Sequence, residues 1–199
     1  MGRYIGPRTK VCRRLGFMIY DNTNIEKAFM KREQEPFRRK QSEYGRRLLE
    51  KQKVMFYYGM REGQMRKMFN LARRTKGNTS KAFLIACERR LDNAVYSAGL
   101  TSSRAQARQL ITHGNILVNG RRLDIPSYLV NTGDTITVSD RAGVRKMVTE
   151  IVEKKSGYVA PDWIAVDPKS LTTKIVRLPV REDVRLPVNE QLLVEFYSR

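Results

Sequence analysis

The chain has 199 residues, of which 39 are Lys or Arg and 20 are Asp or Glu, so its formal charge is +19. Solubility does not require such an excess, which indicates a polyanionic partner, either a nucleic acid or an anionic membrane surface. A hydrophobic content of 41% is enough for a buried core and excludes wholesale disorder. The sequence contains no long apolar run and no apolar segment near its start, so we expect neither a transmembrane helix nor secretion.

The sequence offers little for catalysis or metal binding. Cys12, Cys87 and the single histidine, His113, are too few for a four-ligand zinc site or a disulfide scaffold, and this cysteine usage indicates a reducing, cytoplasmic compartment. No glycine-rich phosphate loop ending in Gly-Lys-Ser/Thr is present. Carboxylate pairs such as Glu182 and Asp183 stand in polar stretches, which favours solvated charge over acid catalysis. We therefore expect no catalytic residue and no cofactor, and we interpret His113 as a helix-end or RNA-contacting residue.

The positive charge is concentrated in the first half of the chain. Residues 1–90 carry 24 basic and 8 acidic residues, a net charge of +16, whereas residues 91–199 carry 15 and 12, a net charge of +3. The first forty residues have no sustained apolar period, so we predict an extended basic arm that becomes ordered on phosphate. A solvated, mobile terminus is the alternative, and the interleaved aromatic residues favour the binding arm.

Helices are predicted after this arm. Ser42 can cap a helix that ends near Gly59, and apolar residues at i, i+3, i+4 and i+7 over residues 65–72 predict a second, amphipathic helix. Gly77-Asn78 ends that helix, and Thr79 or Ser80 is expected to cap the next. Apolar residues at near-helical spacing continue from residue 84 to residue 95.

A small α/β region is predicted from about residue 91 to residue 140. A serine or threonine at positions 101–103 caps a short helix over residues 104–111, and Gly114 ends it. Asn119-Gly120 lies between two extended runs and predicts a hairpin, since both turn positions need a positive φ. Residues 135–138 alternate as a strand. Further on we expect a helix near residues 144–151, strands at 163–166 and 174–178, and a final helix over 190–197 capped by Asn189.

Four arginines in this region lie in a stretch without acidic residues. Arg104 and Arg108 are four apart on the predicted helix, and Arg121 and Arg122 follow the hairpin turn. If the helix packs beside the hairpin, all four can face one phosphate track, for which the guanidinium fork is suited. The alternative is a solvated surface on which long side chains cover apolar atoms.

Particular stretches of the chain resemble a known family. Residues 88–96, 103–110, 113–120 and 125–128 are similar to the small RNA-binding domain named after bacterial small-subunit ribosomal protein four. That domain also occurs in RNA-modifying enzymes, so the segments that flank it must distinguish the ribosomal family from those enzymes. Residues 2–7, 12–14, 42–45, 49–54 and 189–199 resemble the ribosomal family itself, and the chain is identified as a member of it.

The resemblance implies an α+β fold and a non-enzymatic role. A basic arm (1–41) would precede a helical domain (42–88 with 184–199), into which an α/β RNA-binding domain (89–183, motif core 91–140) is inserted. The family is a structural constituent of the small subunit: it binds small-subunit rRNA early and nucleates assembly of the body. It contributes to decoding accuracy at an interface with ribosomal protein five. With proteins three and five it lines the path by which mRNA enters, and Arg38, Arg39 and Lys40 match the family's mRNA-facing group.

From the charge pattern and the resemblance we predict sixteen rRNA-binding residues: Arg3, Arg8, Lys10, Arg13, Arg14, Arg46, Arg47, Lys51, Lys53, Arg66, Arg73, Arg104, Arg108, His113, Arg121 and Arg122. Some relatives hold zinc with four N-terminal cysteines, but here Thr9 replaces the first of a Cys-x-x-Cys pair, so we expect no zinc. No membrane partner is expected, because the basic segments lack the apolar face of a membrane-surface helix. The alternatives are an RNA-modifying enzyme or a free RNA chaperone that uses the same small domain.

Overall fold

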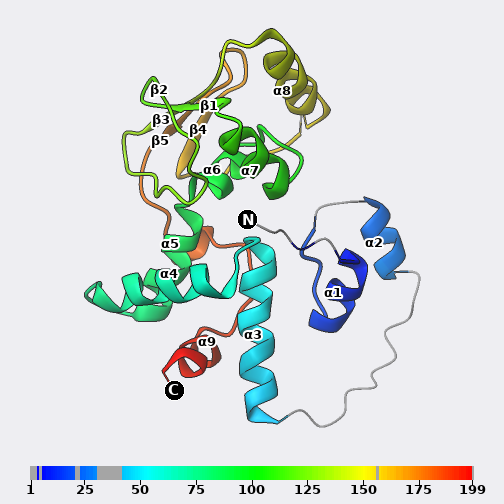
Figure 1. Cartoon of the computed structure of the whole chain (residues 1–199), viewed down its shortest axis with the longest axis vertical. Helices are drawn as coiled ribbons and strands as arrows, with labels where there is room; N and C mark the ends of the chain where they lie inside the picture. The colour runs from blue at the N-terminus through cyan, green and yellow to red at the C-terminus, as the bar shows by residue number, and fades with distance from the viewer. Residues whose placement is uncertain (1–3, 5, 21–22, 31–41, 156, 199) are drawn as a thin grey trace. The chain divides into compact units, whose positions relative to one another are not determined.

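A computed structural model describes residues 4, 6–20, 23–30, 42–155 and 157–198. The chain divides into two compact units (Figure 1). Unit 1 comprises residues 1–83 and 186–199, and unit 2 comprises residues 84–185. Helix α5 (Thr79–Glu88) carries the chain from unit 1 into unit 2, and residues 184–189 carry it back to a last helix that belongs to unit 1.

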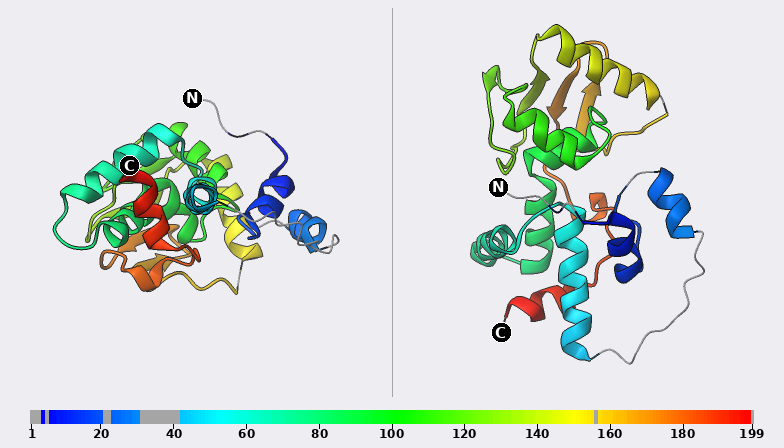
Figure 2. Two further views of the ribbon diagram at one scale, coloured as in Figure 1. Left: turned by 90° about the horizontal axis from the view of Figure 1, so that it is seen from below. Right: turned by 45° about the vertical axis from the view of Figure 1, so that its right-hand side comes forward.

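Unit 1 is helical, as its sequence pattern predicts. Helix α3 (Glu43–Tyr57) begins where Ser42 Oγ accepts a hydrogen bond of 3.2 Å from Gly45 N, and the chain leaves it through Gly59 at a φ of +60°. Helix α4 (Glu62–Arg74) buries its predicted apolar stripe. Helix α9 (Glu190–Tyr197) is capped by Asn189, as expected, and lies against α3 (Figure 2).

The predicted extended arm is wrong for the part of it that the structure describes. Residues Arg8–Leu15 form helix α1, and residues Thr23–Met30 form helix α2. Val11, Cys12 and Leu15 share one face of α1 and bury in a small apolar cluster with Ile19 and Phe29, against which side chains of α3 pack. Each helix has only eight residues, and α1 is rich in Arg and Lys. Its apolar stripe is therefore too short to be recognised from the sequence among so many charged residues.

The helix expected to run on through residues 84–95 is two helices. Helix α5 ends at Glu88, and α6 (Leu91–Ser97) begins after Arg90, whose extended backbone (φ −63°, ψ 137°) breaks the helix. Leu91 N donates a 2.8 Å hydrogen bond to the Tyr128 carbonyl, a non-local bond that spacing cannot reveal. The cap of α5 also differs from expectation: Asn78 Oδ1, and not Thr79 or Ser80, accepts from Ser80 N at 2.9 Å.

Unit 2 is built on a five-stranded antiparallel sheet with the order β2-β1-β3-β5-β4. The predicted hairpin is confirmed: Asn119 and Gly120, at φ values of 53° and 76°, connect β1 and β2. The strands are β1 (Ile116–Val118), β2 (Arg121–Arg122), β3 (Thr135–Val138), β4 (Ile164–Asp167) and β5 (Thr172–Ile175).

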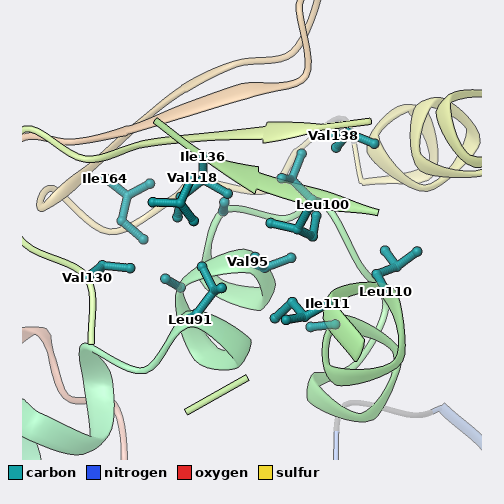
Figure 3. Packing of buried hydrophobic residues seen from close by; sticks show 14 of the residues in the cluster. Leu91, Val95, Leu100, Leu110, Ile111, Val118, Val130, Ile136, Val138 and Ile164 are labelled. Atoms are coloured by element: carbon teal, nitrogen blue, oxygen red, sulfur yellow. The ribbon is translucent and has the colours of Figure 1, made fainter. Parts of the chain in front are cut away.

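Helices close one core over this sheet. Leu91 and Val95 of α6 and Ile111 of α7 (Arg104–Thr112) meet Val118 and Ile136 of the strands in a buried cluster (Figure 3). Helix α8 (Ala142–Lys154) contributes Val148 to the same cluster, and a short 3-10 turn, η1 (Arg181–Asp183), precedes the return to unit 1. The fold is α+β, as the sequence predicts: a helical unit and a unit with a small antiparallel sheet.

Candidate nucleic-acid interface

The hairpin of unit 2 returns to the C-terminal end of α7. Arg122 Nη2 donates a 2.9 Å hydrogen bond to the His113 carbonyl at that end, where a cation is favoured by the helix dipole. Gly114 follows at a φ of +63°, and a Cβ on it would lie 1.9 Å from Arg122 Nε. The left-handed backbone favours glycine at 114, and the Arg122 side chain lies across that residue. His113, Arg121 and Arg122 are all exposed here.

Arg141 also lies at this end of α7, and it is not among the sixteen predicted rRNA-binding residues. The residue is exposed just before α8, and its Nη1 donates a 3.1 Å hydrogen bond to Asn115 Oδ1. Its position in the sequence does not indicate this contact, because Arg141 lies 26 residues from Asn115. The structure thus gathers His113, Arg122 and Arg141 around the segment 113–115. Guanidinium groups fixed in this way present donors suited to phosphate oxygens.

Arg104 lies at the other end of α7 and is held in place. Its Nε donates to Asn93 Oδ1 at 2.8 Å, and its guanidinium carbon lies 4.3 Å from the centre of the Tyr96 ring. Asn93 is itself fixed by Glu88, to whose carbonyl and carboxylate its amide donates. Arg104 therefore faces α6, while Arg122 meets the C-terminal end of α7. Arg108, one turn along α7 from Arg104, is half-buried.

Three predicted cations of α3 are engaged with carboxylates of the same unit. Arg47 Nε pairs with Glu195 of α9 at 2.7 Å, and its Nη2 pairs with Glu43 at 3.2 Å. Lys51, which is buried, pairs with Glu62 of α4 at 2.7 Å. Lys53 pairs likewise with Glu50 at 2.6 Å. Arg47 and Lys51 thus join α3 to α9 and α4, whereas the Lys53 pair lies within α3. The charge of all three is compensated inside unit 1, and a role in rRNA binding stays a prediction.

The other predicted cations of unit 1 are exposed where the structure describes them. Arg13 Nη2 donates to the Ala28 carbonyl at 3.3 Å, and the guanidinium of Arg8 lies 5.2 Å from the Tyr20 ring centre. These contacts hold Arg13 next to α2 and Arg8 next to Tyr20, between α1 and α2, while both cations face solvent. Arg3, Arg38, Arg39 and Lys40 lie outside the described residues. The exposed set is Arg8, Lys10, Arg13 and Arg14 on α1, Arg46 on α3, and Arg66 and Arg73 on α4.

The two thiols are buried, and the described part of the chain has no cluster of metal-binding side chains. Cys12 and Cys87 are both fully buried, and burial holds the pKa of the Cys87 thiol far above its usual range, so it stays protonated. Within the described residues, no three His, Cys, Asp or Glu side chains gather in a way that could hold a metal ion. No described helix is long and apolar enough to span a membrane.

Comparison with known proteins covers the entire chain. Residues 3–88 match the Ribosomal protein S4/S9 N-terminal domain, and residues 89–136 match the S4 domain. The chain is 46% identical to a small ribosomal subunit protein uS4 of Roseiflexus castenholzii, 45% to one of Akkermansia muciniphila and 44% to one of Thermus thermophilus, in each case over 100% of both chains.

The change of family domain at residues 88 and 89 coincides with the helix break between α5 and α6. The second match contains α6, α7 and the hairpin, the elements that position Arg104, His113 and Arg122. Full-length identity above two fifths, together with both family domains in order, identifies the family: the chain is a member of the small ribosomal subunit protein uS4 family.

Proposed function

We propose that the protein is a structural, non-enzymatic component of the small ribosomal subunit that binds small-subunit rRNA directly. The observation that carries the proposal is the full-length match to proteins named small ribosomal subunit protein uS4. The charge of +19 and the exposed guanidinium groups at the end of α7 support it, since rRNA is the polyanion of the ribosome.

Two surfaces of the chain are the candidates for rRNA contact. In unit 2 the surface is the end of α7 with the hairpin, where Arg121, Arg122, His113 and Arg141 are exposed. In unit 1 it comprises the exposed cations of α1 and α4. The domain limits of the proposal are 89–183 for the inserted RNA-binding domain and 42–88 with 184–199 for the helical domain. The compact units 84–185 and 1–83 with 186–199 support this division.

The finer parts of the proposal concern the subunit as a whole. We propose that the protein nucleates assembly of the subunit body and contributes to decoding accuracy through ribosomal protein five. Arg38, Arg39 and Lys40 would face mRNA where it enters, next to ribosomal proteins three and five. The dense cluster of positive charge at 38–40 supports an RNA-facing role for this segment. Crosslinking of mRNA to the protein in assembled subunits tests it, and loss of the crosslink in the triple Gln variant is the expected result.

The central claim is tested by RNA affinity as a function of salt. At physiological salt we expect a junction-containing fragment of small-subunit rRNA to bind at least about tenfold more tightly than an unrelated duplex. Arg121→Gln should reduce the slope of log affinity against log salt by roughly one, because one phosphate contact is lost. Lys174→Gln is the matched control: it removes one exposed cation from β5, two strands away from β1, and should leave the slope unchanged.

Equal affinity for both RNAs would refute specific rRNA recognition and favour a free RNA chaperone. Equal slope changes in the two variants would refute the assignment of Arg121 to the interface. The remaining alternative, an RNA-modifying enzyme, predicts a covalently altered nucleotide after incubation with rRNA, which mass spectrometry of the RNA would detect.

A further inference from the structure

A pocket of about 270 Å³ in unit 1 is not accounted for by the surfaces described above. Its lining side chains come from α4 and from α9, the last helix, where Phe69 and Tyr197 are in contact. Its volume is just below the roughly 300–1,000 Å³ of pockets that hold drug-sized ligands, so it suits a group smaller than such a ligand. The residues that line it are Arg66, Phe69, Asn70, Phe196 and Tyr197.

The aromatic side chains of the pocket form a continuous wall. Tyr197 stacks on Phe69 with ring centres 4.8 Å apart and an interplanar angle of 27°. Phe196 meets Tyr197 edge-on at 5.3 Å. Because these rings come from two helices that are far apart in the sequence, only the fold brings them together. Phe69 is buried behind Tyr197, so the parts of this wall nearest the solvent are the half-buried rings of Phe196 and Tyr197. Aromatic rings are the groups on which bases stack.

Two polar contacts hold the wall in place before any ligand arrives. Tyr197 Oη donates to Glu62 Oε1 at 3.4 Å, and Lys51 Nζ pairs with the other oxygen of the same carboxylate at 2.7 Å. Lys51 Nζ also lies 4.8 Å from the centre of the Phe196 ring. The Glu62 carboxylate and the Lys51 ammonium thus form an ion pair beside the aromatic wall, so the carboxylate is not left unpaired there. A preformed site loses less conformational entropy on binding.

The polar members of the pocket specify the kind of ligand. Arg66 and Asn70 are exposed, one turn apart on α4. Arg66 supplies a guanidinium for a phosphate, and Asn70 supplies an amide that can both donate to and accept from the edge of a base. The exposed neighbours on α4 (Arg61, Lys67, Arg73 and Arg74) are also cationic, so the field at the pocket favours an anionic nucleic-acid chain over a neutral or basic peptide.

We propose that this pocket, built by α4 and α9, takes one unpaired base of RNA, which stacks on the aromatic wall while Arg66 contacts its phosphate and Asn70 its edge. The inference rests on the proposed function and goes further, because it assigns base recognition to unit 1, where the predicted residues are all phosphate-contacting cations. Unpaired bases stacked on aromatic side chains are a common mode of single-stranded RNA binding.

The test uses the full-length protein and two single-stranded probes of about ten nucleotides, a length within the site sizes of single-strand binders. One probe is oligoadenylate and the other is an abasic ribose-phosphate strand of equal length. The two probes carry the same charge, so their electrostatic attraction to the protein is the same. Any effect that depends on the base alone then appears as a difference between them.

Phe196→Leu keeps an apolar side chain but removes its π face, and should weaken oligoadenylate binding about tenfold, inside the range that stacking gives on substitution. Asn70→Ala changes an exposed side chain, so it tests the pocket even if Phe196→Leu unfolds α9, and should weaken oligoadenylate binding about threefold. Neither should change binding of the abasic strand. Gln191→Ala is the matched control: it truncates an exposed amide of α9 outside the pocket and should leave both affinities unchanged.

An equal loss for both probes, or no loss in Asn70→Ala, would overturn the proposal. If wild-type protein binds the rRNA fragment specifically but the pocket variants show no base-dependent loss, the pocket proposal fails and the proposed function stands. If the wild-type protein does not prefer the rRNA fragment, yet the base-dependent loss is present, the proposed function fails in its specific form and the pocket remains a base-binding site.

Discussion

Substitution of Gly114 by alanine perturbs the end of α7 in two separable ways. The residue has a φ of +63°, a left-handed backbone that costs a residue with a side chain roughly 1–2 kcal/mol relative to glycine. The new Cβ would also lie 1.9 Å from Arg122 Nε and 2.5 Å from its guanidinium carbon and Nη2. Arg122 must therefore move, and its hydrogen bond to the His113 carbonyl is lost.

The expected magnitude follows from these two contributions. Loss of the Arg122 hydrogen bond adds at most about 1 kcal/mol, because the guanidinium is exposed and regains water. The full cost of Gly114→Ala should then reach up to about 2–3 kcal/mol in the free energy of unfolding. In an Arg122→Ala background the collision is absent, so the cost should fall to the backbone contribution alone, roughly 1–2 kcal/mol.

Urea unfolding of the four proteins in this cycle measures the difference. Gly133→Ala is the matched control, since Gly133 has a φ of +90° but a Cβ added to it would meet no atom within 4 Å. Its cost should be the same with and without Arg122. An identical cost of Gly114→Ala in both backgrounds would refute the reasoning that Arg122 is what excludes a side chain at 114.

Three further outcomes are expected. Asp183 accepts two hydrogen bonds from Arg177, at 2.6 and 3.0 Å, and this guanidinium lowers the pKa of the carboxyl below its ordinary value of 3.8. The native state therefore binds fewer protons than the unfolded one, so the stability advantage of wild type over Asp183→Asn should be full above pH 4 or so and vanish as pH falls through the native pKa. Cys12 and Cys87 should be unreactive to a thiol reagent in the native protein, and both should react in denaturant, because both are buried; rapid native labelling of either would contradict the packing. A metal chelator should leave the thermal unfolding midpoint unchanged, since apolar packing around Cys12 orders the α1–α2 region; a lowered midpoint would point to a bound metal.

Features that depend on neighbouring residues can be predicted from the sequence alone. The charge of +19, the apolar stripe of α4, the Asn119-Gly120 turn and the Ser42 and Asn189 caps all follow from interactions within a few residues, and each appears in the structure. Short helices are harder to predict from the sequence, because an eight-residue helix such as α1 has only about two turns of apolar pattern among its cations.

Which cations are paired inside the protein and which are exposed depends on long-range contacts. Arg47 and Glu195 are 148 residues apart in sequence, yet they form an ion pair that joins α3 to α9. The rRNA contact predicted for Arg47 stays a prediction. Arg141 reaches the end of α7, and Phe69 meets Tyr197, by the same long-range folding. Charge and periodicity are properties of a segment, but pairing and pocket formation depend on which distant segments the core brings into contact.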